Sequence, residues 1–222
     1  MTLAVKICGL TTPEALDAAL EADADMVGFV FFPPSPRHIA FDAARRLGRR
    51  VRARAEKVAL TVDADDALLD AVVEALRPEL LQLHGKEPPA RVAAVKRRFG
   101  LPVMKAIAVE TKGDLTAVAD YVAVADRLIF DARAPREATR PGGLGSPFDW
   151  RLLQSLDPGV PFVLSGGLDA GNVGDALRIT RAPGVDVSSG IERAPGEKDL
   201  DKIRAFIRAA RQAAAQLMYP AA

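Results

Sequence analysis

The stretch that decides the fold reads Val27-Gly28-Phe29-Val30-Phe31, and it is apolar at every position. A strand with one face in water would alternate apolar with polar residues, so an unbroken apolar run predicts a parallel strand covered on both faces. Similar short runs recur along the chain, and stretches with apolar residues at helical spacing lie between them. The pattern therefore predicts repeated βα units.

The alternation of strand and helix continues through the whole sequence. The predicted strands are Leu3–Cys8, Met26–Phe31, Lys57–Val62, Leu80–Leu83, Val103–Ile107, Arg127–Phe130, Phe162–Leu164 and Val185–Val187. The predicted helices are Pro13–Glu21, Asp42–Val51, Asp66–Leu76, Ala90–Phe99, Leu115–Val122, Trp150–Ser155, Asn172–Thr180 and Leu200–Gln216. Eight such units predict one (β/α)8 barrel, a single domain over residues 1–222.

An open doubly wound sheet is the structural alternative. That fold would carry a dinucleotide or phosphate loop after its first strand, where this chain reads Cys8-Gly9-Leu10-Thr11. The glycine-rich stretch 142–147 has neither the three-glycine dinucleotide spacing nor the lysine of a P-loop. The sequence therefore favours the closed barrel.

Composition narrows the class of protein. The chain has 222 residues, 49% of them hydrophobic, and a formal net charge of +1. The arginines between Arg45 and Arg54 have no interleaved aromatics, which favours a solvated helix face over a nucleic-acid site. One cysteine and two histidines form neither a disulfide nor a cluster with zinc-ligand spacing, so no metal is expected. With neither a signal peptide nor a spanning run, we expect a cytoplasmic protein without a membrane partner.

Polar residues directly after apolar runs are the candidates for chemistry, because strand ends and the following loops form the active face of a barrel. Cys8 ends the first strand, and Asp131 follows the sixth. Cys8 is either a small buried hydrophobe or a base whose pKa is lowered by a donor such as Lys6. Asp131 either caps its loop or pairs with Arg133, or it is an acid facing Cys8 across a substrate.

Two glycine-bearing loops predict a phosphate site. Ser165-Gly166-Gly167-Leu168 follows the seventh strand, and Ser188-Ser189-Gly190-Ile191 follows the eighth. Loops seven and eight, with the N-terminus of a short extra helix, bind phosphate in many barrels through free backbone N–H groups. The alternative is that these glycines only make tight turns. We interpret Gly166, Gly167, Ser189 and Gly190 as contacts to a phosphorylated small molecule.

Arg37 and His84 are further candidates for substrate binding. The planar guanidinium of Arg37 suits a carboxylate, although the residue can also be a surface arginine on the rigid Pro33-Pro34-Ser35-Pro36 loop. His84 follows Leu81-Gln82-Leu83, and it is either a ligand contact or a histidine held by a backbone bond. The sequence leaves both alternatives open.

Taken together, these segments resemble the phosphoribosylanthranilate isomerase family over essentially the whole chain. The residues that carry the resemblance are Lys6-Ile7-Cys8-Gly9-Leu10, Gly28-Phe29-Val30-Phe31, Pro34-Ser35-Pro36-Arg37, Gln82-Leu83-His84-Gly85, Phe130-Asp131, Phe148-Asp149-Trp150, Ser165-Gly166-Gly167-Leu168 and Gly184-Val185-Asp186-Val187-Ser188-Ser189-Gly190-Ile191-Glu192. The resemblance implies a TIM barrel of tryptophan biosynthesis that uses neither metal nor organic cofactor.

The resemblance also implies a reaction and residue roles. The reaction is an Amadori rearrangement of N-(5'-phosphoribosyl)anthranilate to 1-(2-carboxyphenylamino)-1-deoxyribulose 5-phosphate, an aldose–ketose isomerisation. Asp131 is implied as the general acid and Cys8 as the general base. Arg37 is implied on the anthranilate side, with Asp186 assisting there. One departure is Leu144, where family members usually carry a small hydroxyl residue; it puts the geometry of that loop in doubt.

Two rival functions remain at this stage. Another phosphosugar barrel enzyme would share the phosphate loops, but it calls for lysine and glutamate, or for metal-binding histidines, at the strand ends. A non-catalytic phosphosugar-binding barrel would have no need of Cys8 and Asp131. The sequence leaves open whether the chain is a monomer or a homodimer.

Overall fold

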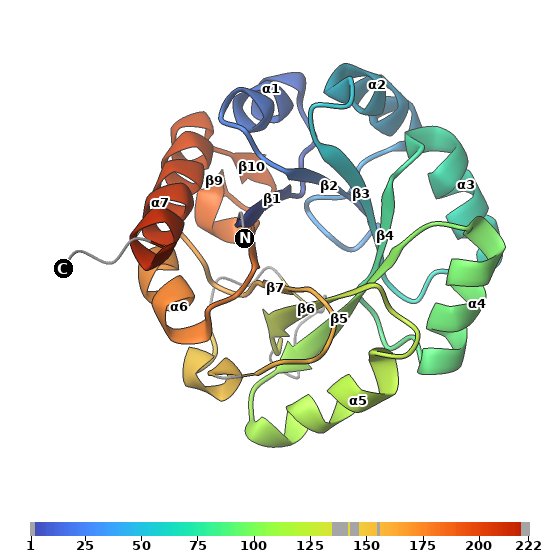
Figure 1. Cartoon of the computed structure of the whole chain (residues 1–222). Coiled ribbons are helices and arrows are strands. Elements are labelled where there is room, and N and C mark those ends of the chain that lie inside the picture. The colour runs from blue at the N-terminus through green and yellow to red at the C-terminus, as the bar shows by residue number, and fades with distance from the viewer. Residues whose placement is uncertain (1–2, 135–141, 143–146, 155, 219–222) are drawn as a thin grey trace.

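The computed structural model describes residues 3–134, 142, 147–154 and 156–218. Its parallel strands form a closed barrel in chain order, from β1 to β8 (Figure 1). The strands are β1 (Ala4–Cys8), β2 (Met26–Phe31), β3 (Glu56–Thr61), β4 (Leu80–Leu83), β5 (Val103–Val109), β6 (Arg127–Ala132), β7 (Phe162–Leu164) and β8 (Gly184–Val187). Because β1 pairs with both β2 and β8, there is no open edge among these strands, and the predicted barrel is confirmed.

Helices surround the barrel and cover its outer face (Figure 1). The α-helices are α1 (Pro13–Glu21), α2 (Phe41–Val51), α3 (Asp66–Leu76), α4 (Pro89–Phe99), α5 (Val118–Tyr121), α6 (Val173–Thr180) and α7 (Leu200–Met218). The 3-10 helices are η1 (Lys112–Ala117), η2 (Trp150–Leu153) and η3 (Ser189–Ile191). A two-stranded hairpin that the sequence did not predict, β9 (Glu192–Ala194) and β10 (Glu197–Lys198), lies between β8 and α7.

Local signals explain where several helices begin and end. Thr12 caps α1 by accepting a hydrogen bond from the Ala15 N–H at 3.3 Å, and Pro13 occupies the first turn. Asp65 caps α3 through the Leu68 N–H at 2.8 Å. Gly100 ends α4 in the left-handed region with φ of 63°. The predicted bounds of α1 and α3 are therefore confirmed.

Two predicted helices are wrong in kind or extent. The predicted helix Trp150–Ser155 is only the 3-10 turn η2, because the chain becomes extended at Gln154 and Pro158 follows soon after. The predicted helix 115–122 is instead η1 followed by the single turn of α5. Thr111 and Asp114 form a capping box that starts this segment earlier than apolar spacing indicated.

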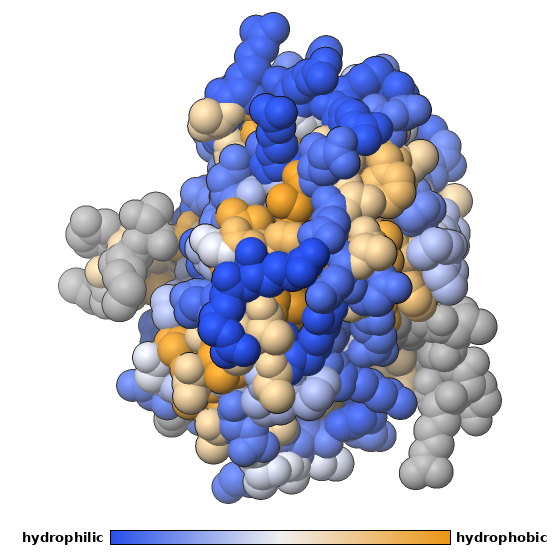
Figure 2. All heavy atoms as spheres, turned by 90° about the vertical axis from the view of Figure 1, so that its right-hand side faces the viewer, coloured by the Kyte–Doolittle hydropathy of each residue, from blue (hydrophilic) through white to orange (hydrophobic). Residues whose placement is uncertain are grey.

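The barrel interior is apolar at one end and polar at the other. An inner cluster of Met26, Val58, Leu80, Met104, Ile129 and Val163 fills the lower interior. Side chains two residues further along a strand point to the same face, so Gln82 lies above Leu80 and Asp131 lies above Ile129. A larger apolar cluster packs the strands against the helices. The outer face over α3 and α4 is largely hydrophilic (Figure 2).

Candidate active site

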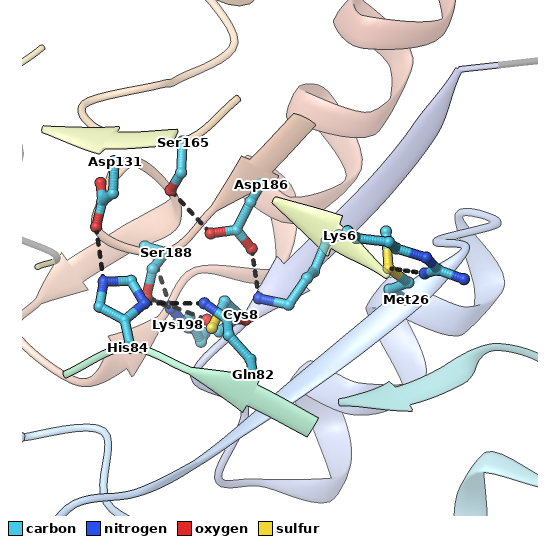
Figure 3. A network of polar contacts seen from close by, with 11 residues as sticks. Lys6, Cys8, Met26, Gln82, His84, Asp131, Ser165, Asp186, Ser188 and Lys198 are labelled. Carbon is cyan, nitrogen blue, oxygen red and sulfur yellow. Dashed lines mark hydrogen bonds and ion pairs between the residues drawn. The ribbon is translucent and has the colours of Figure 1, made fainter. Parts of the chain in front are cut away.

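The carboxyl ends of β1, β4, β6 and β8 bring a network of buried polar side chains together (Figure 3). Cys8 and Asp131 both belong to this end of the barrel, on strands at different sides of it. The side chain of Cys8 is 3% exposed and that of Asp131 is similarly buried. Both side chains therefore lie at the end of the barrel where the sequence analysis placed them.

Lys6 places a positive charge beside the Cys8 thiol. A Cβ built on Gly28 would lie 3.0 Å from Cys8 Sγ and 3.2 Å from Lys6 Nζ, so the thiol and the ammonium share the space that this glycine leaves. Burial raises the pKa of the Cys8 thiol, and the charge of Lys6 lowers it only in part. The candidate donor Lys6 therefore lies beside the thiol, and its charge offsets part of the effect of burial on the thiol pKa.

Asp186 is the counter-ion of Lys6. Its Oδ1 lies 2.7 Å from Lys6 Nζ, and its Oδ2 accepts a hydrogen bond from Ser165 Oγ at 2.9 Å (Figure 3). Burial alone would lower the pKa of Lys6, but the Asp186 carboxylate raises it above its ordinary value. Lys6 is therefore a permanent cation in a fully buried position.

Asp131 is held by the His84 imidazole and a backbone N–H on the other side of the mouth. Its Oδ2 lies 3.1 Å from His84 Nε2, and its Oδ1 accepts the Ala132 N–H at 2.9 Å. His84 Nδ1 in turn lies 2.9 Å from Gln82 Nε2 (Figure 3). The alternative pairing with Arg133 is wrong, because that arginine pairs with Asp114 and Glu110.

Arg37 is a buried residue, not a surface arginine. Its Nε and Nη2 donate to the two carboxylate oxygens of Glu192 at 2.7 and 2.8 Å. Lys198 Nζ also contacts Glu192, at 2.8 Å. Burial would raise the pKa of Glu192, but the hydrogen bond from Arg37 and the charge of Lys198 hold it below its ordinary value. Arg37 thus lies with Glu192, whereas Asp186 lies with Lys6.

The two glycine-bearing loops pack closely against each other and against β6. Gly166 and Gly167 have φ of 87° and 67°, so both make the turn that one of the sequence interpretations expected. A Cβ on Gly166 would lie 2.5 Å from the Ala132 nitrogen, and one on Gly190 would overlap the Leu168 carbonyl. Ser189 begins the short helix η3. The structure therefore has tight, closely packed glycine turns where the sequence predicted phosphate contacts.

Comparisons with known proteins identify the family to which the chain belongs. The model of the N-(5'phosphoribosyl)anthranilate (PRA) isomerase family matches residues 5–209. The chain belongs to this family. The N-(5'-phosphoribosyl)anthranilate isomerase of Nitrobacter hamburgensis is 68% identical over 213 residues, which cover 96% of this chain and 95% of that protein. The protein of the same name from Rhodopseudomonas palustris is 66% identical over 96% of this chain and 100% of its own length.

Solved structures of the PRA isomerase family share the fold of this chain. The crystal structure of phosphoribosyl anthranilate isomerase from Thermotoga maritima has a TM-score of 0.86 and 34% identity, and covers 95% of this chain and 100% of that one. A second crystal structure contains reduced 1-(o-carboxyphenylamino)-1-deoxyribulose 5-phosphate, with a TM-score of 0.83 and 33% identity over 95% and 100% of the two chains. These matches confirm the resemblance and decide against another phosphosugar barrel enzyme.

Sequence reasoning missed several residues of this PRA isomerase site. Gln82 and Glu192 stood in quoted motifs without a role, and Lys198 lies in the unpredicted hairpin. Gln82 lies 2 residues from its partner His84, and Lys198 lies 6 and 10 residues from its partners, so local spacing could have indicated these pairs. Glu192 lies 155 residues from Arg37, and no local pattern predicts that pair. The prediction about Leu144 falls outside the described residues. Within the described part of the chain, no group of three His, Cys, Asp or Glu residues is placed to hold a metal, and no helix is long and apolar enough to cross a membrane.

Proposed function

We propose that this chain converts N-(5'-phosphoribosyl)anthranilate to 1-(2-carboxyphenylamino)-1-deoxyribulose 5-phosphate, with Asp131 as the general acid and Cys8 as the general base. The observation that carries the assignment is that both groups are buried at the carboxyl end of one barrel, each with its own polar partners. Supporting it, a family structure holds a reduced form of the product.

The first step belongs to Asp131. Its protonated carboxyl gives a proton to the ribose ring oxygen as the C1–O bond breaks, and the nitrogen lone pair forms the C=N bond of the Schiff base. The carboxylate that remains accepts from the Ala132 N–H and lies against His84. Both groups are already in place before the charge develops, which lowers the cost of forming it.

The second step belongs to Cys8. Its thiolate removes the C2 proton, the C–H electron pair forms the C1=C2 double bond, and the C=N π pair returns to nitrogen to give an enolamine. The enolamine becomes the ketone when its C2 hydroxyl loses a proton and C1 gains one. The neighbouring Lys6 ammonium favours the thiolate, while burial opposes it. A thiol with a raised pKa is a stronger base once ionised, which suits abstraction of a carbon-bound proton.

Binding is proposed to use the remaining residues. Arg37 would hold the anthranilate carboxylate, with its orientation fixed by Glu192. His84 and Asp186 would contact the ligand from the two halves of the mouth, with Asp186 assisting on the anthranilate side. Gly166, Gly167, Ser189 and Gly190 would hold the phosphate through backbone N–H groups. We further propose one catalytic domain over residues 1–222, a cytoplasmic location, and a monomer or homodimer, both forms being named for the Thermotoga maritima protein.

The test is the loss of the substrate's anthranilate fluorescence, with substrate generated freshly, in wild type, Cys8→Ser and Asp131→Asn. We expect each change to lower kcat by about 10²- to 10⁴-fold while ligand binding persists. Near-wild-type turnover in both variants would remove the mechanism. Loss of activity in wild type after exhaustive chelation would contradict the metal-free reaction. Wild-type protein that binds but never turns over would support the non-catalytic rival.

A further inference from the structure

Gln82 is a buried residue that contacts His84, the histidine beside Asp131. It lies on β4, its side chain is fully buried, and it points into the barrel above Leu80. Its Nε2 lies 2.9 Å from His84 Nδ1. Among the described residues, its Oε1 has no hydrogen-bond partner. A fully buried amide that uses its nitrogen and leaves its oxygen unpaired is costly, so this orientation needs a reason.

The reason follows from the chemistry of the two groups. An amide nitrogen only donates, and a neutral imidazole has one donor and one acceptor nitrogen. When Gln82 Nε2 donates to His84 Nδ1, the imidazole proton must be on Nε2, where it points at Asp131 Oδ2. The reversed amide would instead require a proton on His84 Nδ1, and a neutral imidazole would then have no N–H to donate to Asp131 Oδ2.

We propose that Gln82 is a positioning residue that fixes His84 in its Nε2–H tautomer and thereby orients the Asp131 carboxyl for proton transfer. This inference rests on the proposed role of Asp131 as the acid. Each carboxyl oxygen then has one fixed donor, the Ala132 N–H on Oδ1 and the His84 N–H on Oδ2. These donors stabilise the carboxylate that forms when Asp131 gives up its proton.

Backbone packing around the pair supports a fixed geometry. A Cβ on Gly142 would overlap Asp131 Oδ2 and lie 3.0 Å from His84 Nε2. A Cβ on Gly166 would lie 3.0 Å from Asp131 Oδ1. The carboxyl and imidazole are therefore enclosed by main chain on both sides, and the direction of their shared hydrogen bond depends on which nitrogen of His84 carries the proton.

The test reads the tautomer directly. The chain has only two histidines, so ¹⁵N-histidine labelling gives two imidazole spectra, and His38→Gln assigns them. We expect His84 in wild type to be protonated on Nε2 and unprotonated on Nδ1. Gln82→Met keeps the side-chain length but removes the donor, so we expect the Nδ1–H tautomer to become populated. We expect kcat to fall about tenfold, the effect of one lost hydrogen bond, with KM changed less than about twofold.

Thr61→Val is the matched control. Thr61 is equally buried, lies on the neighbouring strand β3, and has a side-chain oxygen without a hydrogen-bond partner among the described residues. We expect it to leave the His84 tautomer and kcat unchanged.

An Nδ1–H tautomer in wild type overturns the inference, and this measurement holds even if Gln82→Met fails to fold. An unchanged tautomer in Gln82→Met also overturns it. Normal kcat in Gln82→Met together with lost turnover in Asp131→Asn overturns the inference but leaves the proposed function intact. Normal turnover in Asp131→Asn instead removes the proposed acid role of Asp131, on which the inference rests.

Discussion

The two halves of the active-site mouth are built on different electrostatics. Around β1 and β8, which we call the lysine half, the Cys8 thiol lies beside the Lys6–Asp186 ion pair. Around β4 and β6, which we call the histidine half, Asp131 lies beside the His84 imidazole and the Ala132 N–H, with no lysine or arginine partner among the described residues. A cation favours a thiolate, which a base requires. The difference teaches that one barrel end can give two buried titratable groups quite different partners, as the proposed base and acid roles require.

The largest expected effect on stability comes from breaking the Lys6–Asp186 ion pair. Lys6→Met leaves the Asp186 carboxylate buried without its counter-ion, so we expect the free energy of unfolding to fall by about 3–5 kcal/mol. Urea denaturation measures this change. Lys96→Met is the control, because Lys96 also lies 2.7 Å from a carboxylate, Asp126, but with its side chain 42% exposed. We expect that variant to lose at most about 1 kcal/mol. Equal losses would mean that burial of the Lys6 pair has no special weight.

The Arg37–Glu192 pair extends the lysine half to the hairpin and gives it a pH dependence. The pKa of Glu192 is depressed in the folded state, so its contribution is complete above the ordinary carboxyl pKa of about 4.3 and is lost as the pH falls through the folded value. We expect Glu192→Gln to reduce the free energy of unfolding by about 1–3 kcal/mol at pH 7, and by less at pH 3.

Denaturation of wild type and variant across this pH range tests the sign. Glu197→Gln, an exposed partner of Arg193 in the same hairpin, is the control and should follow the wild-type curve. A gap between wild type and Glu192→Gln that widens in acid would contradict the assignment.

The close packing of Gly28 against the Cys8 thiol and Lys6 predicts a smaller effect on stability. Gly28→Ala would place a methyl group 3.0 Å from Cys8 Sγ and 3.2 Å from Lys6 Nζ. We expect a loss of about 1–2 kcal/mol in stability, because a crowded core must shift, and a lower kcat from the displaced thiol. Gly113→Ala, where the nearest atom is 3.6 Å away, is the control for the substitution itself. Wild-type kcat in Gly28→Ala would show that the thiol has room to move.

The smallest effect on stability is expected around Asp131, on the β4 and β6 side of the mouth. Asp131→Asn removes no partner of a lysine or arginine, and its amide can still accept from the Ala132 N–H, so we expect less than about 1 kcal/mol of destabilisation despite the loss of turnover. Asp186→Asn makes the same change beside Lys6, where we expect about 3–5 kcal/mol. Similar unfolding free energies for the two variants would remove the contrast between the halves.

Short-range sequence patterns predicted most elements of the fold. The apolar run 27–31 predicted β2 almost residue for residue, since a strand covered on both faces has no polar positions. Thr12 and Pro13 predicted the start of α1, since capping depends on neighbours in the chain. The helix predicted at 150–155 was wrong because four apolar-spaced residues cannot hold a helix against an extended Gln154.

The sequence by itself determined the barrel and the strand ends at which polar residues collect, because strand period and turn chemistry are local properties. Only the tertiary structure decided the partners: Asp186 reaches Lys6 across 180 residues of chain, and Glu192 reaches Arg37 across 155. Barrel closure makes these contacts by bringing β8 against β1. These long-range contacts set the electrostatic surroundings of Cys8 and Asp131, and no spacing in the sequence encodes them.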